Sequence, residues 1–295
     1  RKSNIVLPPD KPRLYLPPMN HFIADDGEKI HLAISGDGPP LVLLHGWTAD
    51  HREWSPFIHA LSEHHRVYRW DARGHGHHEL SSSSVPNVQR MARDLANLLD
   101  HYQLKQAVVL GHSMGALTLW QYIGDHGSER LAKLCIIDQS PKLVTDDDWH
   151  DGIYGNFSAT QSEAFLERLR EDFAENVLRL IADGLNAQAK EKYLENTRGW
   201  QKSRALLQSL NPEPLIACWE SLTHADYRPV LARIAIPTLL IYGGASNFYR
   251  RATAEYVASQ IRGSDLRIYE DTDHSPHLWA RERFVLDLLE FTQRP

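Results

Sequence analysis

The chain has little cysteine, no long apolar run and no excess of positive charge. Its 295 residues include two cysteines, Cys135 and Cys218, which cannot form a disulfide framework. No stretch approaches the roughly 18 uninterrupted apolar residues of a membrane-spanning helix, so no membrane span is expected. Lys and Arg number 32 against 38 Asp and Glu, which gives a formal net charge of −6 with the two signs well mixed. We therefore expect no nucleic-acid partner.

Targeting and metal-binding signals are also sparse. The chain begins Arg1-Lys2 without methionine, which leaves open the removal of an N-terminal signal; we otherwise expect a cytoplasmic protein. Seventeen histidines are a high count, and His75, His77 and His78 follow a glycine-bearing loop that could line a cleft. Metal sites need histidines that converge with carboxylates or thiolates, so solvated loop histidines are the preferred interpretation. No metal and no cofactor are predicted.

The sequence does contain a regular alternation of strand and helix patterns. After a proline-rich stretch at residues 1–20, predicted to form an extended arm, short apolar runs alternate with helical spacing through residues 21–141 and again through 230–295. Repeated strand–helix units predict an α/β fold, with a mostly parallel central sheet and helices on both faces. Residues 142–229 break the alternation and carry helical spacing only, which predicts an inserted helical cap.

The most informative stretch covers residues 107–116. Apolar residues lead directly into Gly-His-Ser-Met-Gly, and helical spacing follows. The apolar run predicts a strand buried on both faces, and Gly111 and Gly115 suit a tight turn where the next helix crosses close to the strand. Such a turn holds the Ser113 hydroxyl clear of the sheet, above the positive end of a helix. Ser113 is therefore the predicted nucleophile.

Three further motifs accompany this turn: His45-Gly46 after an apolar run, Asp71-x-Arg73-Gly74-x-Gly76 after the next, and His274 before the last helical pattern. With these motifs the chain resembles the α/β-hydrolase-fold superfamily, in its serine esterase and lipase-like branch with a helical cap. The resemblance covers residues 21–295. It implies one catalytic domain whose crevice lies at the carboxyl ends of the strands, beneath the cap.

The resemblance implies which histidine is the base. A serine hydroxyl is a poor nucleophile at neutral pH and needs a base within hydrogen-bonding reach. His274 lies where family members place that base, so it is expected to take the Ser113 proton and return it to the leaving group. His277 is the competing candidate, expected to face away from the first turn of a helix. His112 is expected to point away from Ser113.

The acid departs from the commonest family pattern. Most relatives carry Asp or Glu in the loop that here contains Ser246 and Asn247, and neither side chain supplies a negative charge. A minority of the fold places the acid after the strand that follows the nucleophile helix, where this chain has Asp138. Asp138 is therefore the expected acid, with a turn-capping role as the alternative. Asp71 is expected to tie its own loop together with Arg73.

Two backbone amides are needed for the oxyanion that forms when a serine attacks a carbonyl. The resemblance implies the N–H groups of Met114 and Trp47. Four aromatic residues of the predicted cap could line an apolar acyl or alkyl pocket or could form the core of the cap itself: Trp149, Tyr154, Phe157 and Trp219.

These features predict a serine hydrolase that cleaves a small-molecule carboxylic ester, thioester or lactone through an acyl-Ser113 intermediate. Several alternatives remain open: a hydrolase of amides or carbon–carbon bonds, a cofactor-free perhydrolase, or a ligand receptor without catalysis. The missing carboxylate at the usual acid position favours the receptor. The complete set of Ser113, His274 and Asp138 argues against it.

Overall fold

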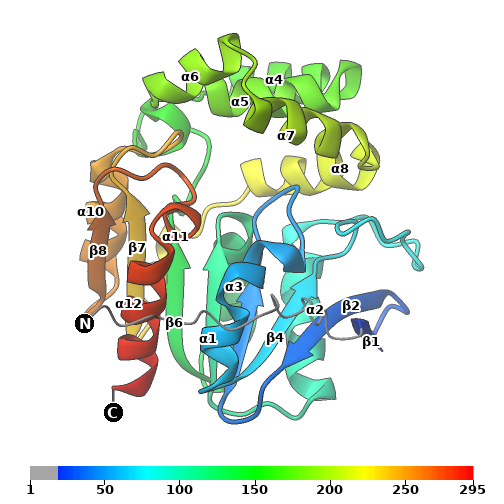
Figure 1. Cartoon of the computed structure of the whole chain (residues 1–295), viewed down its shortest axis with the longest axis vertical. Helices are drawn as coiled ribbons and strands as arrows, with labels where there is room; N and C mark the ends of the chain where they lie inside the picture. The colour runs from blue at the N-terminus through cyan, green and yellow to red at the C-terminus, as the bar shows by residue number, and fades with distance from the viewer. Residues whose placement is uncertain (1–18, 295) are drawn as a thin grey trace, which may run out of the picture.

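The structure, a computed structural model, describes residues 19–294, so the arm predicted for residues 1–20 lies almost wholly outside the described residues. One eight-stranded sheet organises the fold, with strand order β1-β2-β4-β3-β5-β6-β7-β8 (Figure 1). The two pairs that involve β2 are antiparallel and the other five are parallel. The strands are β1 (Met19–Ile23), β2 (Lys29–Ser35), β3 (Pro40–Leu44), β4 (Arg66–Asp71), β5 (Ala107–His112), β6 (Leu131–Ile137), β7 (Thr238–Gly243) and β8 (Asp265–Tyr269).

Helices cover both faces of the sheet, which confirms the predicted α/β class (Figure 1). In β3, Leu41 and Leu43 pack toward the apolar layer under one set of helices, while Val42 and Leu44 pack toward the opposite layer. This alternation explains why the strands read as continuous apolar runs. The covering helices are α1 (Ile58–Ser62) and α12 (Arg281–Gln293) on one face, and α2 (Val88–His101), α3 (Met114–His126) and α10 (Arg251–Gln260) on the other.

The first helical segment differs from its sequence pattern. The spacing of Trp54, Phe57 and Leu61 predicts one helix over residues 52–63. The structure instead has a 3₁₀ helix, η1 (His51–Phe57), followed by the short α1. Pro56 lies inside η1 and has no amide hydrogen to donate, which disfavours a continuous α-helix at this point.

A helical layer lies between β6 and β7 in the sequence and covers the carboxyl ends of the parallel strands (Figure 1). Its apolar side chains pack against those of the layer beneath. The sulfur atom of Cys218 in the cap, for example, lies 3.5 Å from the sulfur atom of Met114 in α3. The helical layer therefore encloses space above the sheet. Its helices are α4 (Ala159–Glu171), α5 (Phe173–Ala182), α6 (Ala187–Leu194), α7 (Arg198–Gln208) and α8 (Pro212–Thr223), with the short η2 (Ile153–Gly155) before them and α9 (Arg228–Leu231) after them.

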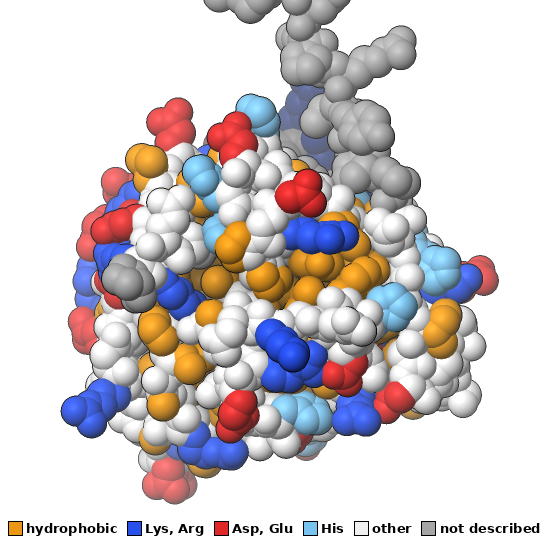
Figure 2. Space-filling model, turned by 90° about the horizontal axis from the view of Figure 1, so that it is seen from below, with side chains coloured by type: hydrophobic (Ala, Val, Ile, Leu, Met, Phe, Trp, Pro, Cys, Tyr) orange, Lys and Arg blue, Asp and Glu red, His pale blue; other side chains and the backbone are white. Residues whose placement is uncertain are grey.

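The face opposite the cap has a mixed surface. Figure 2 shows hydrophobic side chains gathered near its middle, with Lys, Arg, Asp and Glu side chains interspersed around them. Within residues 19–294, every helix is too short or too polar to cross a membrane. The cavities described below lie on the other side, beneath the cap.

Candidate active site

Ser113 stands on a tight turn between β5 and α3. Its backbone has φ 52° and ψ −116°, a conformation that few residues other than glycine adopt. The turn is close-packed: a Cβ on Gly111 would lie 2.5 Å from the Gly115 backbone, and one on Gly115 would lie 2.3 Å from the carbonyl oxygen of Leu44. The two glycines therefore let α3 cross close to the sheet, and the turn presents the Ser113 side chain to a cavity.

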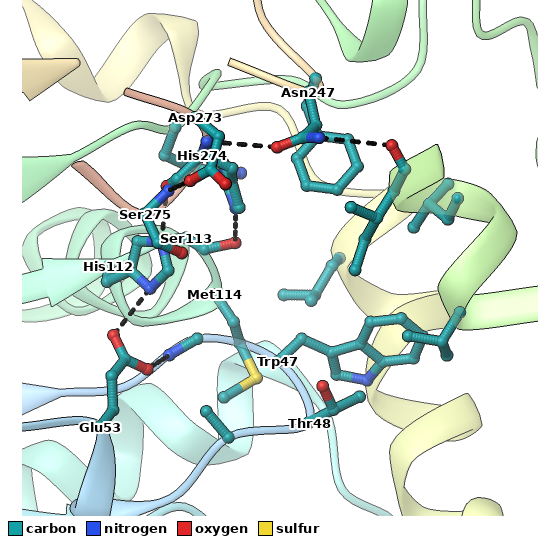
Figure 3. Close-up of a pocket in the computed structure, with 18 of the residues that line it drawn as sticks. Trp47, Thr48, Glu53, His112, Ser113, Met114, Asn247, Asp273, His274 and Ser275 are labelled. Atoms are coloured by element: carbon teal, nitrogen blue, oxygen red, sulfur yellow. Dashed lines mark hydrogen bonds and ion pairs between the residues drawn. The ribbon is translucent and has the colours of Figure 1, made fainter. Parts of the chain in front are cut away.

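Ser113, His274 and Asp138 are brought into one hydrogen-bonded chain. Nε2 of His274 lies 2.9 Å from the hydroxyl oxygen of Ser113 (Figure 3). Nδ1 of the same ring lies 2.7 Å from Oδ2 of Asp138. A ring that donates from Nδ1 to a carboxylate leaves Nε2 free to accept a proton from a hydroxyl. The arrangement has the geometry of a nucleophile, a base and an orienting acid.

Asp138 is fully buried at the end of β6. Its Oδ1 accepts a hydrogen bond of 3.2 Å from the backbone N–H of Gly243, and its Oδ2 accepts one of 2.7 Å from the hydroxyl of Ser246. Asp138 thus reaches His274 from β6, while the loop after β7 supplies donors to it. Sequence reasoning overlooked this use of Ser246, because that residue was considered only as a substitute for the acid.

The loop after β3 carries the second candidate oxyanion donor. The ring of His45 accepts a hydrogen bond from the N–H of Ala72 at Nε2 and, at Nδ1, lies 2.8 Å from the carbonyl oxygen of Gly46. This fixes the peptide that precedes Trp47. Trp47 and Met114 both line the cavity beside Ser113 (Figure 3).

The cavity above Ser113 has a volume of about 560 Å³ and lies between the sheet and the cap. Its size falls in the range of small-molecule sites, about 300–1,000 Å³. Ser113 and His274 lie in its wall, and most of its lining is apolar. The apolar part includes Trp47, Met114, Leu117, Leu143, Ile153, Val177, Leu180, Ile181, Leu206, Trp219, Leu222, Phe248 and Leu278.

Of the four aromatic residues considered for the pocket, Trp219 lines this cavity and the other three do not. Trp149 is buried against Tyr256, with its indole N–H donating to the carbonyl of Lys142. Tyr154 and Phe157 pack on each other at the base of the cap, and the Tyr154 hydroxyl donates to the carbonyl of Leu180. Phe157 packs within the cap against Phe165, as the alternative interpretation expected, whereas Trp149 and Tyr154 join the cap to Tyr256 and Phe248 of the core.

Electrostatics favour a neutral His274. Burial lowers the pKa of His274 from its ordinary value, and the nearby ring of His112 lowers it further, although the bond to Asp138 opposes both effects. A base with a lowered pKa is unprotonated, and therefore able to accept a proton, over a wider pH range.

Two expectations for the neighbouring motifs are wrong. His75 is 2% exposed rather than solvated, and burial lowers its pKa to about 3. Asp71 does not pair with Arg73. The guanidinium of Arg73 binds Asp94 instead, with 2.6 Å between its Nε and Oδ2 of Asp94. Asp71 accepts hydrogen bonds from His51 and from His78.

His277 and His112 both turn away from the hydroxyl of Ser113 and toward Glu53. His277, on α11 (Pro276–Trp279), is fully buried, and its Nε2 lies 3.0 Å from Oε1 of Glu53. Nδ1 of His112 lies 2.8 Å from the same oxygen (Figure 3). Sequence reasoning missed Glu53, because nothing local distinguishes this carboxylate from any other in a first helical turn.

Within residues 19–294, two groups of side chains are close enough together to hold a metal ion: Glu53, His112 and His277, and Asp50, His51 and Asp71. In the first group the Glu53 contacts to both rings are of hydrogen-bond length, as is the contact between His51 and Asp71 in the second. Hydrogen bonding accounts for these contacts without a metal ligand role.

Residues 39–281 match the model of the alpha/beta hydrolase fold family. The match spans well over half of the chain, and the chain belongs to this family. The family assignment agrees with the sheet, the tight turn at Ser113 and the position of the cavity.

Curated relatives of similar length extend the comparison. The chain is 28% identical over 263 residues to the pimeloyl-[acyl-carrier protein] methyl ester esterase of Vibrio vulnificus, covering 89% of this chain and 97% of the relative. It is 27% identical over 282 residues to the non-heme chloroperoxidase CPO-A1 of Kitasatospora aureofaciens, covering 91% and 98%. Among solved structures, the esterase EaEST from Exiguobacterium antarcticum superposes with a TM-score of 0.80 at 24% identity, covering 93% of this chain and 99% of that one. This last likeness shows the shared fold.

Proposed function

We propose that this protein is a serine hydrolase that cleaves a carboxylic ester, thioester or lactone with an apolar acyl or alkyl group. The observation that carries the proposal is the chain of hydrogen bonds from Ser113 through His274 to the buried Asp138, beside a mostly apolar cavity. The esterase names of its relatives support the same reaction class.

In the proposed reaction, His274 takes the proton of Ser113 at Nε2 while the serine oxygen attacks the carbonyl carbon of the substrate. Collapse of the tetrahedral intermediate expels the alcohol, which receives the proton from His274, and leaves an acyl-Ser113. A water molecule, deprotonated by His274, then releases the acid and restores the serine. Asp138 keeps the proton on Nδ1 and stabilises the imidazolium that forms in each half-reaction.

The negative charge on the carbonyl oxygen requires nearby donors, and we assign them to the N–H groups of Met114 and Trp47. Met114 begins α3, so its amide points from the positive end of that helix. Each such donor contributes about 3 kcal/mol or more to stabilisation of the transition state.

The substrate is expected to be small, with an apolar group that fills the cavity. Trp47 and Trp219 pack on each other across the boundary between the sheet and the cap, with ring centroids 4.5 Å apart, and both line the cavity. A second cavity of about 580 Å³ adjoins it and shares Val177, Ile181 and Leu206. We assign this second cavity to the entry path or to the distal part of the substrate.

A fluorophosphonate probe followed by peptide mapping tests the mechanism. Labelling should occur at Ser113 alone, and Ser113→Ala should abolish both labelling and the burst of nitrophenol from a short-chain nitrophenyl ester. Full turnover in Ser113→Ala would overturn the proposal.

A panel of esters, thioesters, lactones, amides and diketones then separates the reaction classes. Turnover of esters, thioesters or lactones above the others is expected. Preferential cleavage of amides or carbon–carbon bonds would favour the related hydrolases, and tight ligand binding with no turnover would favour a receptor.

A further inference from the structure

A buried carboxylate lies beside the nucleophile turn and contacts three segments of the site. Glu53, on η1, has a side chain that is only 5% exposed. Its Oε2 accepts a hydrogen bond of 3.0 Å from the N–H of Gly46, and its Oε1 lies 2.8 Å from Nδ1 of His112 and 3.0 Å from Nε2 of His277. These partners come from the loop after β3, the residue before Ser113 and the helix after His274.

The other ring nitrogen of His112 also faces an acceptor. Its Nε2 lies 2.9 Å from the backbone carbonyl oxygen of His274. A carbonyl oxygen and a carboxylate oxygen can only accept hydrogen bonds, so both contacts require a proton on the ring nitrogen. A ring that donates from both nitrogens is an imidazolium. Glu53 also accepts from the N–H of Gly46 and lies beside a second imidazole, and these contacts favour the ionised carboxylate. With Glu53 ionised, the hydrogen-bond pattern gives His112 a positive charge.

Resting on the proposed function, we infer that Glu53 and His112 form a buried ion pair that positions the loops of the active site and keeps the base His274 in its neutral form. Both are positioning residues, because their polar contacts are with backbone groups, with each other and, for Glu53, with His277, rather than with the hydroxyl of Ser113. The carboxylate restrains the His45–Gly46 peptide, one residue before Trp47, and the imidazolium restrains the backbone of His274.

Ionisation of the pair agrees with its surroundings. Burial acts against charge on both groups, yet the Glu53 carboxylate raises the pKa of His112 above its ordinary value, and His112 holds the pKa of Glu53 well below its own. His277, the other ring on Glu53, stays neutral because burial lowers its pKa to about 4. The site therefore holds one imidazolium, on His112.

This imidazolium acts directly on the base. The ring centroids of His112 and His274 are 5.0 Å apart, so the positive charge disfavours a second proton on His274. The titratable and charged groups that face either ring are Glu53 from η1, Asp138 after β6, Tyr249 from the loop after β7, Asp273 from the same loop as His274, and His277 from α11. Asp138 and Asp273 favour a proton on His274, and His112 opposes them.

Two substitutions separate the charge of His112 from its hydrogen bonds. A glutamine amide reaches the position of Nε2, so His112→Gln can still donate to the His274 carbonyl without carrying a charge. An asparagine amide reaches the position of Nδ1, so His112→Asn can still donate to Glu53 but loses the link to His274. The matched control is His65→Gln, because His65 is a buried histidine that bonds Thr292 at the opposite end of the sheet.

The first measurement is the pH dependence of kcat/KM for a nitrophenyl ester. In both His112 variants the acid limb should move up by about one pH unit, since a charge about 5 Å from His274 has been removed. His112→Asn should also lose about ten- to a hundredfold in kcat through misplacement of His274, with KM changed less than kcat. An acid limb at the wild-type position in both variants would overturn the inference, as would an equal shift in His65→Gln.

The second measurement does not depend on any substrate. In the wild-type protein labelled with ¹⁵N-histidine, the His112 resonances, assigned by their loss in His112→Gln, should show two protonated ring nitrogens at pH 7.5. A neutral-ring pattern for His112 at this pH would overturn the ion pair whatever the kinetics of the variants.

The two proposals fail in different ways. A wild-type protein that is not labelled at Ser113 by the fluorophosphonate would remove the proposed function. A protein that is labelled at Ser113 and turns over esters, but whose His112 ring is neutral, would remove the ion pair alone.

Discussion

Ser246 donates a hydrogen bond of 2.7 Å to Oδ2 of Asp138, the same oxygen that lies 2.7 Å from Nδ1 of His274. The loop after β7 therefore contributes a hydroxyl where most family members are expected to carry the acid. Side chains that follow two neighbouring strands, β6 and β7, thus lie together on one side of the His274 ring. Predictions for the acid and its support follow from this geometry.

Replacing the acid with its amide should impair catalysis without unfolding the protein. Asp138→Asn keeps the shape of the side chain but loses the charge that fixes the tautomer of His274, so turnover should fall by about 10³ to 10⁴. Steady-state kinetics on a nitrophenyl ester, together with the melting temperature, provide the measurement. Asn247→Ala is the control: it removes a 3.3 Å hydrogen bond from the N–H of His274, and the expected loss is about fivefold. Equal effects of the two changes would contradict the assignment of Asp138.

Removing the hydroxyl that supports the acid should have an intermediate effect. Ser246→Ala leaves the Asp138 carboxylate with one donor fewer in a fully buried position. A hydrogen bond to a charged group contributes about 1.5–3 kcal/mol, so the free energy of unfolding should fall by this amount. Chemical denaturation measures the change, and turnover should lie between that of the wild type and that of Asp138→Asn. A variant as inactive as Asp138→Asn would mean that Ser246 has a more direct role than support.

Activity should persist below the ordinary pKa of histidine. His274 must be neutral to accept the proton of Ser113, and burial lowers its pKa below 6.5. As the pH falls, activity is therefore retained through 6.5 and is lost only when the pH passes the lowered pKa. The acid limb of kcat/KM, which reports groups of the free enzyme, should have its midpoint below 6.5. A midpoint at or above 6.5 would contradict the neutral base.

The cavity assignment distinguishes two tryptophans of the cap. Trp219→Ala should change the ratio of kcat/KM between long and short acyl chains by about tenfold or more, because an apolar wall discriminates by about 1–3 kcal/mol per methylene. Trp149→Ala should leave that ratio unchanged and lower the free energy of unfolding by about 3–5 kcal/mol, as expected for a buried aromatic residue. A change in chain-length preference in Trp149→Ala would show that the cavity reaches further than the structure places it.

Buried neutral histidines should make the fold sensitive to acid. Burial lowers the pKa of His75 to about 3, so below pH 6.5 the unfolded chain binds a proton that the folded protein rejects. The free energy of unfolding should fall by roughly 2 kcal/mol between pH 6.5 and 5 from this residue alone. His75→Asn can keep the donor to the Arg73 carbonyl, and should be less stable at pH 7 with a weaker pH dependence. The exposed His59→Gln is the control, and an unchanged slope in His75→Asn would contradict the prediction.

The sequence predicts the parts of this site that local patterns determine. Ser113 is identifiable because its turn requires Gly111 and Gly115 between a strand pattern and a helix pattern, all within ten residues. Asp138 and His274 could be placed only through family resemblance, because their contact joins positions 136 residues apart. Glu53 escaped notice for the same reason, since its contacts with His112 and His277 span 59 and 224 residues.

Periodicity also fails to say which face of a helical layer meets a cavity. Trp149, Phe157 and Trp219 are all buried aromatic residues of the cap, yet only Trp219 of these three faces the site. His75 is predicted to be solvated because it lies in a loop, yet its side chain is buried. The sequence pattern around a loop histidine does not show what packs against it.

The loop after β7 has contacts in two directions. Its Ser246 donates to the buried Asp138, while the carbonyl of Asn247 accepts the N–H of Leu185 at 2.8 Å and that of Ala245 accepts the side chain of Asn186. One short loop therefore supports the carboxylate beside His274 and also anchors the cap. Movement of the cap at residues 185–186 is thus coupled, through this loop, to the hydrogen bonding of the imidazole.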